Sequence, residues 1–174
     1  LSKGQKNNNS AIYISLFSSL ATFILSIFIW YSMDFSSSEF QFLEEQSWIN
    51  NFIKFKLGVD GISILFIVLT TLITPICIVS CINSVKDRIK EFLIAILVLE
   101  TFMIGVFCSL DLVVFYLFFE AGLIPMFLII GVWGGPRRVY SAFKFFLFTL
   151  LGSVLMLAAI IAIYWITGTT DVTQ

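Results

Sequence analysis

Five long apolar stretches, each about as long as a lipid bilayer is thick, dominate this sequence. A helix needs about 20 apolar residues to cross the hydrocarbon core of a bilayer, whereas the strands of a transmembrane barrel alternate apolar and polar residues. The stretches are continuous, so they predict helices, which satisfy their own backbone hydrogen bonds in lipid. The sequence therefore predicts an all-α membrane protein with five transmembrane helices, at residues 11–31, 62–82, 92–110, 112–133 and 145–166.

The composition supports a membrane protein and excludes several other classes. Of the 174 residues, 59% are hydrophobic and 12% are charged, whereas a soluble domain carries about 25% charged residues. The net charge of -1 gives no basic surface for phosphates, so the expected partner is a lipid bilayer and not a nucleic acid. The sequence contains no histidine, which removes a common general base and metal ligand. We predict no catalytic residue, no cofactor-binding residue and no metal site in this chain.

The segments outside the predicted spans are polar. A single residue, Asp111, joins the third and fourth spans, and helix capping is its favoured role. Because the sequence begins with Leu1, we expect a fragment, a processed product or an alternative start. The predicted segments are a polar N-terminal segment at 1–10, a loop at 32–61 with an interfacial stretch, a basic loop at 83–91, a basic turn at 134–144 and a tail at 167–174.

Basic residues are concentrated on one side of the predicted membrane. Eight lie on the side that carries the N-terminus (the basic side) and two on the other (the acidic side). Loops rich in Lys and Arg stay on the cytoplasmic side, which corresponds to the matrix in mitochondria. We therefore predict that the N-terminus faces the cytoplasm or matrix. The eight are Lys3, Lys6, Lys86, Arg88, Lys90, Arg137, Arg138 and Lys144, and the two are Lys54 and Lys56.

Glu120 is the most informative residue, because it lies well inside a predicted span. A charged side chain at the centre of a membrane helix costs about 2.5–3.5 kcal/mol on insertion scales, and such residues usually serve ion or proton transfer. Glu120 is therefore the candidate for reversible protonation, and the alternative is a structural, hydrogen-bonded carboxyl. Pro125 removes the backbone hydrogen bond to Ala121, which either frees that carbonyl for water or makes an ordinary kink.

Glu100 and Lys144 are further candidates for a proton route. Glu100 lies ten residues before Leu110 and Glu120 ten after it, so a tight hairpin of the third and fourth spans would place both carboxylates at similar depth. They could then share a proton or a water chain; otherwise Glu100 makes a separate polar contact. Lys144 opens the last span and either snorkels to the basic side or faces an acid inside the bundle.

Four strings, in this order and spacing, resemble chain 4 of the proton-pumping NADH:quinone oxidoreductases, the respiratory complex I family. They are LGVDGIS at 57–63, FFEAGLIPM at 118–126, IGVWG at 130–134 and FLFTLLGS at 146–153. The resemblance runs from about Ser10 to Asp171. Among members of the family, the sequence is similar to mitochondrial or alphaproteobacterial forms. It implies one part of a larger antiporter-like helical bundle in the membrane arm, with Glu120 at the position of the family's intramembrane switchable carboxylate.

The resemblance also implies what surrounds the chain. As a subunit of an NADH:ubiquinone reductase of the respiratory chain, it would help to couple quinone reduction to proton translocation, without redox chemistry of its own. NADH, FMN, iron–sulfur clusters and ubiquinone would belong to partner subunits of complex I. The implied location is the mitochondrial inner membrane, multi-pass, with the N-terminus on the matrix side, and the alternative is a bacterial plasma membrane.

The family pattern is only partly present, because the chain resembles spans two to six of the family. The family's first span and its broken seventh helix, with the Lys that pairs with the intramembrane acid, have no counterpart here. We therefore expect either a split subunit, whose remaining spans lie in a second polypeptide, or a truncated sequence. The alternative functions are a subunit of a multi-subunit cation/proton antiporter or a membrane-bound hydrogenase, or a purely structural chain of the membrane arm.

Overall fold

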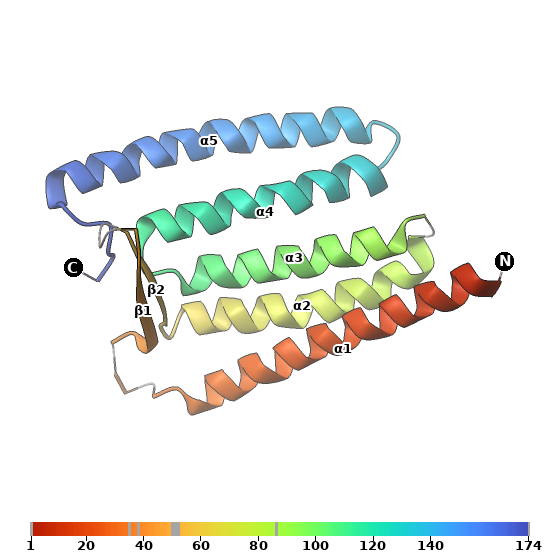
Figure 1. Cartoon of the computed structure of the whole chain (residues 1–174), viewed down its shortest axis with the longest axis horizontal. Coiled ribbons are helices and arrows are strands. Elements are labelled where there is room, and N and C mark those ends of the chain that lie inside the picture. Colours follow the sequence, from red (N-terminus) through yellow and green to blue (C-terminus); the bar gives the residue numbers. More distant parts are fainter. Residues whose placement is uncertain (1, 35, 38, 50–52, 86, 174) are drawn as a thin grey trace.

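The computed structural model describes residues 2–34, 36–37, 39–49, 53–85 and 87–173. Within these ranges the chain forms five long helices and one antiparallel hairpin (Figure 1). Each helix is long and apolar enough to cross a membrane, so the predicted all-α membrane architecture is confirmed. The elements are α1 (Ser2–Ser32), β1 (Gln41–Ile49), β2 (Ile53–Val59), α2 (Ser63–Ser84), α3 (Ile89–Cys108), α4 (Leu112–Trp133) and α5 (Arg138–Thr167).

The helices stand side by side in the order of the sequence, with α1 and α5 at the two ends of the row (Figure 1). Neighbours along the chain pack against each other, and α1 also contacts α3. Short connections make α2 to α5 antiparallel to their neighbours, and α1 runs antiparallel to α2, so the start of α1, the α2–α3 connection and the α4–α5 turn share one end (Figure 1). The basic residues predicted for the basic side lie in these segments or in the first two turns of α3 and α5, except that Lys86 lies outside the described residues.

The helices extend beyond the predicted spans into polar sequence. The first helix begins at Ser2, so the polar segment predicted at 1–10 continues α1. The last helix begins at Arg138, which shortens the predicted basic turn at 134–144 to four residues. Arg and Lys at the start of α5 are good helix formers, whereas residues 2–10 are mostly Ser, Gly and Asn, which are poor ones. A loss of hydropathy therefore does not by itself end a helix.

A hairpin occupies much of the segment that the sequence predicts as a loop. Strands β1 and β2 pair antiparallel, with Gln41 opposite Val59 and Ser47 opposite Lys54, and the register shifts twice along the pair. These shifts explain why the strands are hard to see in the sequence, because an irregular ladder does not require a strict alternation of apolar and polar residues. The pairing gives this extramembrane backbone its hydrogen-bond partners.

Three segments that are far apart in the sequence meet beside the hairpin, and we call them the latch: residues 56–57, 109–112 and 170–173. The backbone N–H of Leu110 donates to the Lys56 carbonyl (3.0 Å), and the N–H of Leu112 donates to the Thr170 carbonyl (2.9 Å). The N–H of Val172 in turn donates to the Leu110 carbonyl (2.9 Å). The latch therefore ties β2 and the chain that follows α5 to the α3–α4 joint.

Acidic side chains complete the latch. Asp111 Oδ1 accepts from the backbone N–H groups of Val113 (2.8 Å) and Val114 (3.2 Å), which confirms the predicted capping role. Its Oδ2 accepts from the hydroxyl of Thr170 (2.5 Å). Beside it, Lys56 Nζ lies 2.7 Å from Asp171 Oδ2, and both side chains are largely buried. Charged groups are therefore paired at the point where the chain returns to the joint.

Two clusters of buried apolar residues lie where α1, α2, α3 and β2 meet. One lies towards the basic side and the other near the hairpin, while α4 and α5 add contacts along the row. Many large apolar side chains elsewhere are exposed, including Trp165 (84%) and Ile166 (86%) on α5. Such exposure is expected where lipid or further helices cover the surface. The clusters are Ile12, Ile78, Ile89 and Leu93, and Met33, Val59, Ile64 and Ile67.

Candidate functional site

Glu120 lies in the middle of α4, eight residues after Leu112, which is about 12 Å along the helix axis. Its side chain is half-buried, and its Oε1 atom is buried without a hydrogen-bond partner among the described residues. An unpaired carboxyl oxygen in a low-dielectric region is unfavourable. The atom is therefore available to a proton, to water or to a basic group.

Tyr116, one helical turn before Glu120, is the polar neighbour of the carboxyl. Its phenol lies against both the Glu120 carboxyl and the hydroxyl of Ser153 on α5. Ser153 is 2% exposed, and its Oγ donates to the Leu150 carbonyl (2.9 Å). A carboxyl, a phenol and a hydroxyl thus form a short polar row from α4 to α5, and all three groups can hold or pass a proton.

Several aromatic rings pair on α4 and between α4 and α5. Phe115 and Phe119 are stacked on α4 with ring centroids 6.3 Å apart. One to two turns further on, Phe127 makes edge contacts with Phe143 (5.4 Å) and Phe146 (5.5 Å) of α5. These pairs add apolar contacts on α4 and between α4 and α5, on the same helices as the polar row.

Glu100 lies in a second polar region, between α1, α2 and α3. The side chain is 5% exposed, and the hydroxyl of Thr22 on α1 donates to its Oε1 (3.0 Å). Thr74 on α2 is a further polar neighbour of the carboxyl. One turn along both helices, the hydroxyls of Ser26 and Thr71 are hydrogen-bonded (2.8 Å) and buried. Hydroxyl groups thus provide Glu100 with partners from two other helices.

The two carboxylates have different partners. The polar neighbours of Glu100 come from α1 and α2, whereas the polar neighbour of Glu120 is Tyr116 on α4, which in turn lies against Ser153 on α5. Lys144 is exposed on α5, nine residues before Ser153, which is about 14 Å along the helix. The structure therefore brings neither Glu100 nor Lys144 into a hydrogen bond or ion pair with Glu120 among the described residues, and proton sharing between them remains a prediction.

Sequence reasoning identified the two carboxylates but missed some of their partners. Tyr116 precedes Glu120 by four residues, and side chains at that spacing meet on a helix, so this neighbour could have been found. Thr22 is 78 residues from Glu100, and nothing in the local sequence indicates that contact. In the described part of the chain, no cluster of three or more His, Cys, Asp or Glu side chains suited to a metal is present.

Comparisons with protein families match nearly the whole chain. The profile described as NADH-ubiquinone oxidoreductase chain 4, amino terminus, matches residues 5–106. A second profile, described as NADH:quinone oxidoreductase/Mrp antiporter, TM, matches residues 109–174. The boundary between the two falls at the α3–α4 joint, so Glu100 lies in the first matched region and Glu120 in the second.

Individual relatives agree with these profiles. The chain is 54% identical over 169 residues to NADH-quinone oxidoreductase subunit M of Rhodobacter capsulatus, which covers 97% of this chain and 33% of that protein. It is 51% identical over 160 residues to NADH-ubiquinone oxidoreductase chain 4 of Marchantia polymorpha, covering 91% of this chain and 32% of the relative. The chain therefore spans about a third of the length of the curated relatives that it matches.

A solved structure has the same arrangement of helices. The chain superposes on a chain of respiratory complex I from Thermus thermophilus with a TM-score of 0.79 and 27% identity. The match covers 92% of this chain and 33% of that chain. Sequence profile, relatives and fold agree, and the chain-4 profile alone matches more than half of the 174 residues. This chain is accordingly a multi-pass membrane protein that belongs to the NADH-ubiquinone oxidoreductase chain 4 family.

Proposed function

We propose that this chain forms part of the membrane arm of a proton-translocating NADH:quinone oxidoreductase. Within it, Glu120 is the carboxylate that gains and loses a proton during turnover. The observation that carries the proposal is the buried, unpartnered Oε1 of Glu120 in the middle of a membrane-spanning helix. A group in such a place responds strongly to any nearby charge. Redox chemistry would occur on NADH, FMN, iron–sulfur clusters and ubiquinone in partner subunits.

The remainder of the proposal concerns the partners of Glu120. The relatives are about three times as long as the region that this chain matches. We propose that a basic side chain in the unmatched part of the subunit lies against Glu120. That remainder would be carried by a second polypeptide if the subunit is split. Movement of the basic group, driven by quinone reduction, would shift the proton affinity of Glu120. Tyr116 and Ser153 would carry the proton towards α5, while Glu100 and Lys144 would act on other segments of the route.

The location and orientation follow from the same proposal. The chain would lie in a mitochondrial inner membrane or a bacterial plasma membrane, with the basic side in the matrix or cytoplasm. Relatives occur both in a plant, Marchantia polymorpha, and in a bacterium, Rhodobacter capsulatus.

The test is the substitution Glu120→Gln in the assembled complex. Gln keeps the size and removes the titratable proton, so we expect the complex to assemble and oxidise NADH while most proton translocation is lost. Protons translocated per NADH oxidised would be measured in sealed vesicles. Glu120→Asp keeps an acid and is expected to retain part of the activity. Glu44→Gln, at an exposed site on β1, is the matched control and is expected to pump normally.

Two alternatives predict different results in the same experiment. A structural chain predicts that Glu120→Gln pumps at full stoichiometry, which would remove Glu120 from the mechanism. A cation/proton antiporter or hydrogenase subunit is favoured by the second family profile, whose description includes the Mrp antiporter. That alternative predicts that the chain purifies in a membrane complex without NADH oxidation activity.

A further inference from the structure

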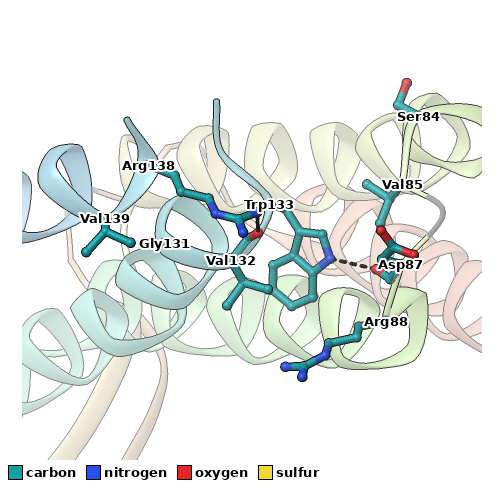
Figure 2. Close-up of a pocket in the computed structure, with 9 residues that line it drawn as sticks. All are labelled: Ser84, Val85, Asp87, Arg88, Gly131, Val132, Trp133, Arg138 and Val139. Carbon is teal, nitrogen blue, oxygen red and sulfur yellow. Dashed lines mark hydrogen bonds between the residues drawn. The ribbon is translucent and has the colours of Figure 1, made fainter. Parts of the chain in front are cut away.

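A large pocket opens at the basic side, between the α2–α3 connection and the α4–α5 turn. Its volume is about 880 Å³. Figure 2 shows the Trp133 indole at the centre of the side chains that line this pocket, with the guanidinium groups of Arg138 and Arg88 on different sides of it. The residues come from the ends of α2 and α4 and the beginnings of α3 and α5, so the pocket lies where four spans leave the membrane.

The walls of the pocket are held in place by hydrogen bonds. The indole Nε1 of Trp133 donates to the Asp87 carbonyl (2.9 Å; Figure 2). The Trp133 ring also makes an edge contact with Phe92, with ring centroids 5.1 Å apart. One nitrogen of the Arg138 guanidinium donates to the Val132 carbonyl (2.6 Å). A guanidinium has five N–H donors, so Arg138 is positioned by one and retains others for a ligand.

The pocket has a positive electrostatic environment. Its described lining contains two arginines and one aspartate, Asp87. Arg88 Nη1 also lies 3.8 Å from Glu91 Oε2, and both side chains are more than 60% exposed. This ion pair is therefore weak. Helices α3 and α5 begin here, and neither is capped by the side chain of its N-cap residue. Their free N–H groups and helix dipoles add to the attraction for an anion.

Apolar surface continues from the pocket along α5. Val139 and Phe143 are exposed on the first turns of that helix, at 59% and 54%, and Val85 and Val132 line the pocket itself. Trp is enriched at the level of the lipid headgroups, where its ring is half in lipid and half in water. A ligand that fits this place has an anionic group at the level of the arginines and a long apolar part beside α5.

We propose that this pocket binds the phosphate headgroup of an anionic phospholipid, attracted by the charges of Arg88 and Arg138 on the two sides of Trp133, with the acyl chains along the exposed face of α5. A basic pocket between transmembrane helices on the cytoplasmic or matrix side is the environment in which such headgroups bind. Two arginines also match the oxygen geometry of a phosphate better than lysines do. The site is independent of Glu120, which lies in the middle of the membrane.

The test is photolabelling of the purified membrane complex that contains this chain, in nanodiscs of phosphatidylcholine. The probe is a phosphatidylglycerol with a photoreactive group near the start of one acyl chain, and the control probe is the phosphatidylcholine with the same chains. We expect the anionic probe to label peptides from residues 84–92 and 131–143. Excess unlabelled phosphatidylglycerol should remove this labelling, whereas inorganic phosphate should not.

The matched variants separate a specific site from general attraction. The double variant Arg88→Gln/Arg138→Gln should lower the affinity by about 25-fold, because each basic group near an anionic headgroup contributes about fivefold. The control variant Lys90→Gln/Arg137→Gln removes the same charge on the same side, outside the described pocket lining, and should label as the unmodified protein does. Arg88→Lys/Arg138→Lys keeps the charge and should label at an intermediate level.

Three results would overturn the proposal. Equal labelling by the phosphatidylcholine probe would show that the headgroup charge is not recognised. An equal loss in the two Gln variants would show a diffuse electrostatic effect and no pocket. Displacement by inorganic phosphate would identify a site for a free anion and not for a lipid. The competition experiments use the unmodified protein, so they decide the matter even if the Gln variant does not assemble.

Discussion

Single residues determine how closely neighbouring helices approach. Gly105 of α3 faces the Phe118 ring of α4, and a methyl group at Gly105 would lie 2.6 Å from the nearest ring carbon. The ring has little room to move, because it also contacts Phe55 and Phe102. We expect Gly105→Ala to force α3 and α4 apart and to lower the free energy of unfolding by about 1–3 kcal/mol. Unfolding by denaturant in mild detergent would measure the change.

The control for this substitution is Gly152→Ala. Gly152 is also inside a helix, but a methyl group there would have no described atom within 4 Å. The higher helix propensity of Ala should leave stability unchanged or raise it by up to about 1 kcal/mol. Equal effects of the two substitutions would mean that the contact between Gly105 and Phe118 does not limit packing.

The sequence predicts residue roles best where the partners are local. Asp111 could be assigned as a helix cap because its carboxylate accepts from backbone N–H groups only two and three residues further along the chain. Glu120 could be identified because charged residues are rare in membrane spans. The second partner of Asp111, Thr170, is 59 residues away. That contact depends on where α5 ends in space, which no local pattern records.

Among the elements, the latch is expected to respond to acid. Burial raises the pKa of Asp171, but the hydrogen bonds from Lys56 and Thr173 outweigh it, so this pKa lies below the usual aspartate value. A group with a lowered folded-state pKa stabilises the fold above its unfolded-state pKa, and this contribution is lost as the pH falls through the folded-state pKa. The latch should therefore remain closed at neutral pH and open progressively below about pH 4.

Hydrogen exchange would measure this opening at two amides, Leu112 and Val172, whose N–H groups donate within the latch. Asp171→Asn should reduce their protection at pH 7 by about 10-fold or more, since a hydrogen bond to a charged group contributes about 1.5–3 kcal/mol. It should also abolish the loss of protection in acid. Glu44→Gln on β1 is the control and should leave the acid response unchanged. If the Asp171→Asn chain still loses protection in acid, the opening depends on another group.

The elements could be predicted in proportion to how strongly lipid constrains them. The five spans follow from apolar length, and the structure places a helix over each of them. The hairpin was not predicted, because its register shifts near Gln41 and Ser47 remove the regular alternation that marks a strand. The helical residues beyond the apolar stretches were also not predicted. Hydropathy shows where a span leaves the lipid, but the backbone hydrogen bonds of the helix continue past that point.

At the scale of the whole molecule, Figure 1 places the α2–α3 connection and the α4–α5 turn at one end of the helix axes and the hairpin at the other. The segments at the first end are rich in Lys and Arg, and those beside the hairpin are rich in Asp and Glu. If the basic end faces the matrix or cytoplasm, Gly135→Cys should be protected from a membrane-impermeant thiol reagent added outside mitoplasts or spheroplasts, and Ser36→Cys should react. Both positions are exposed. The background chain would carry Ala in place of its three native cysteines, which are Cys77, Cys81 and Cys108.

Permeabilised membranes provide the control for this experiment, because both introduced thiols should then react. The reverse pattern in sealed membranes would invert the orientation and, with it, the side on which an anionic lipid meets Arg88 and Arg138. Reaction of both thiols in sealed membranes would mean that one of the two segments is not where the row of helices places it.

The partners that meet in the latch are synthesised at different times. Lys56 is made 115 residues before Asp171, and translation proceeds at about 5–20 residues per second, which gives a delay of about 6–23 s. During that interval α2 to α5 enter the membrane while the hairpin lacks its last partner. Arrival of residues 170–173 is then the event that gives Lys56 its partner, so a segment made later stabilises one that was made earlier.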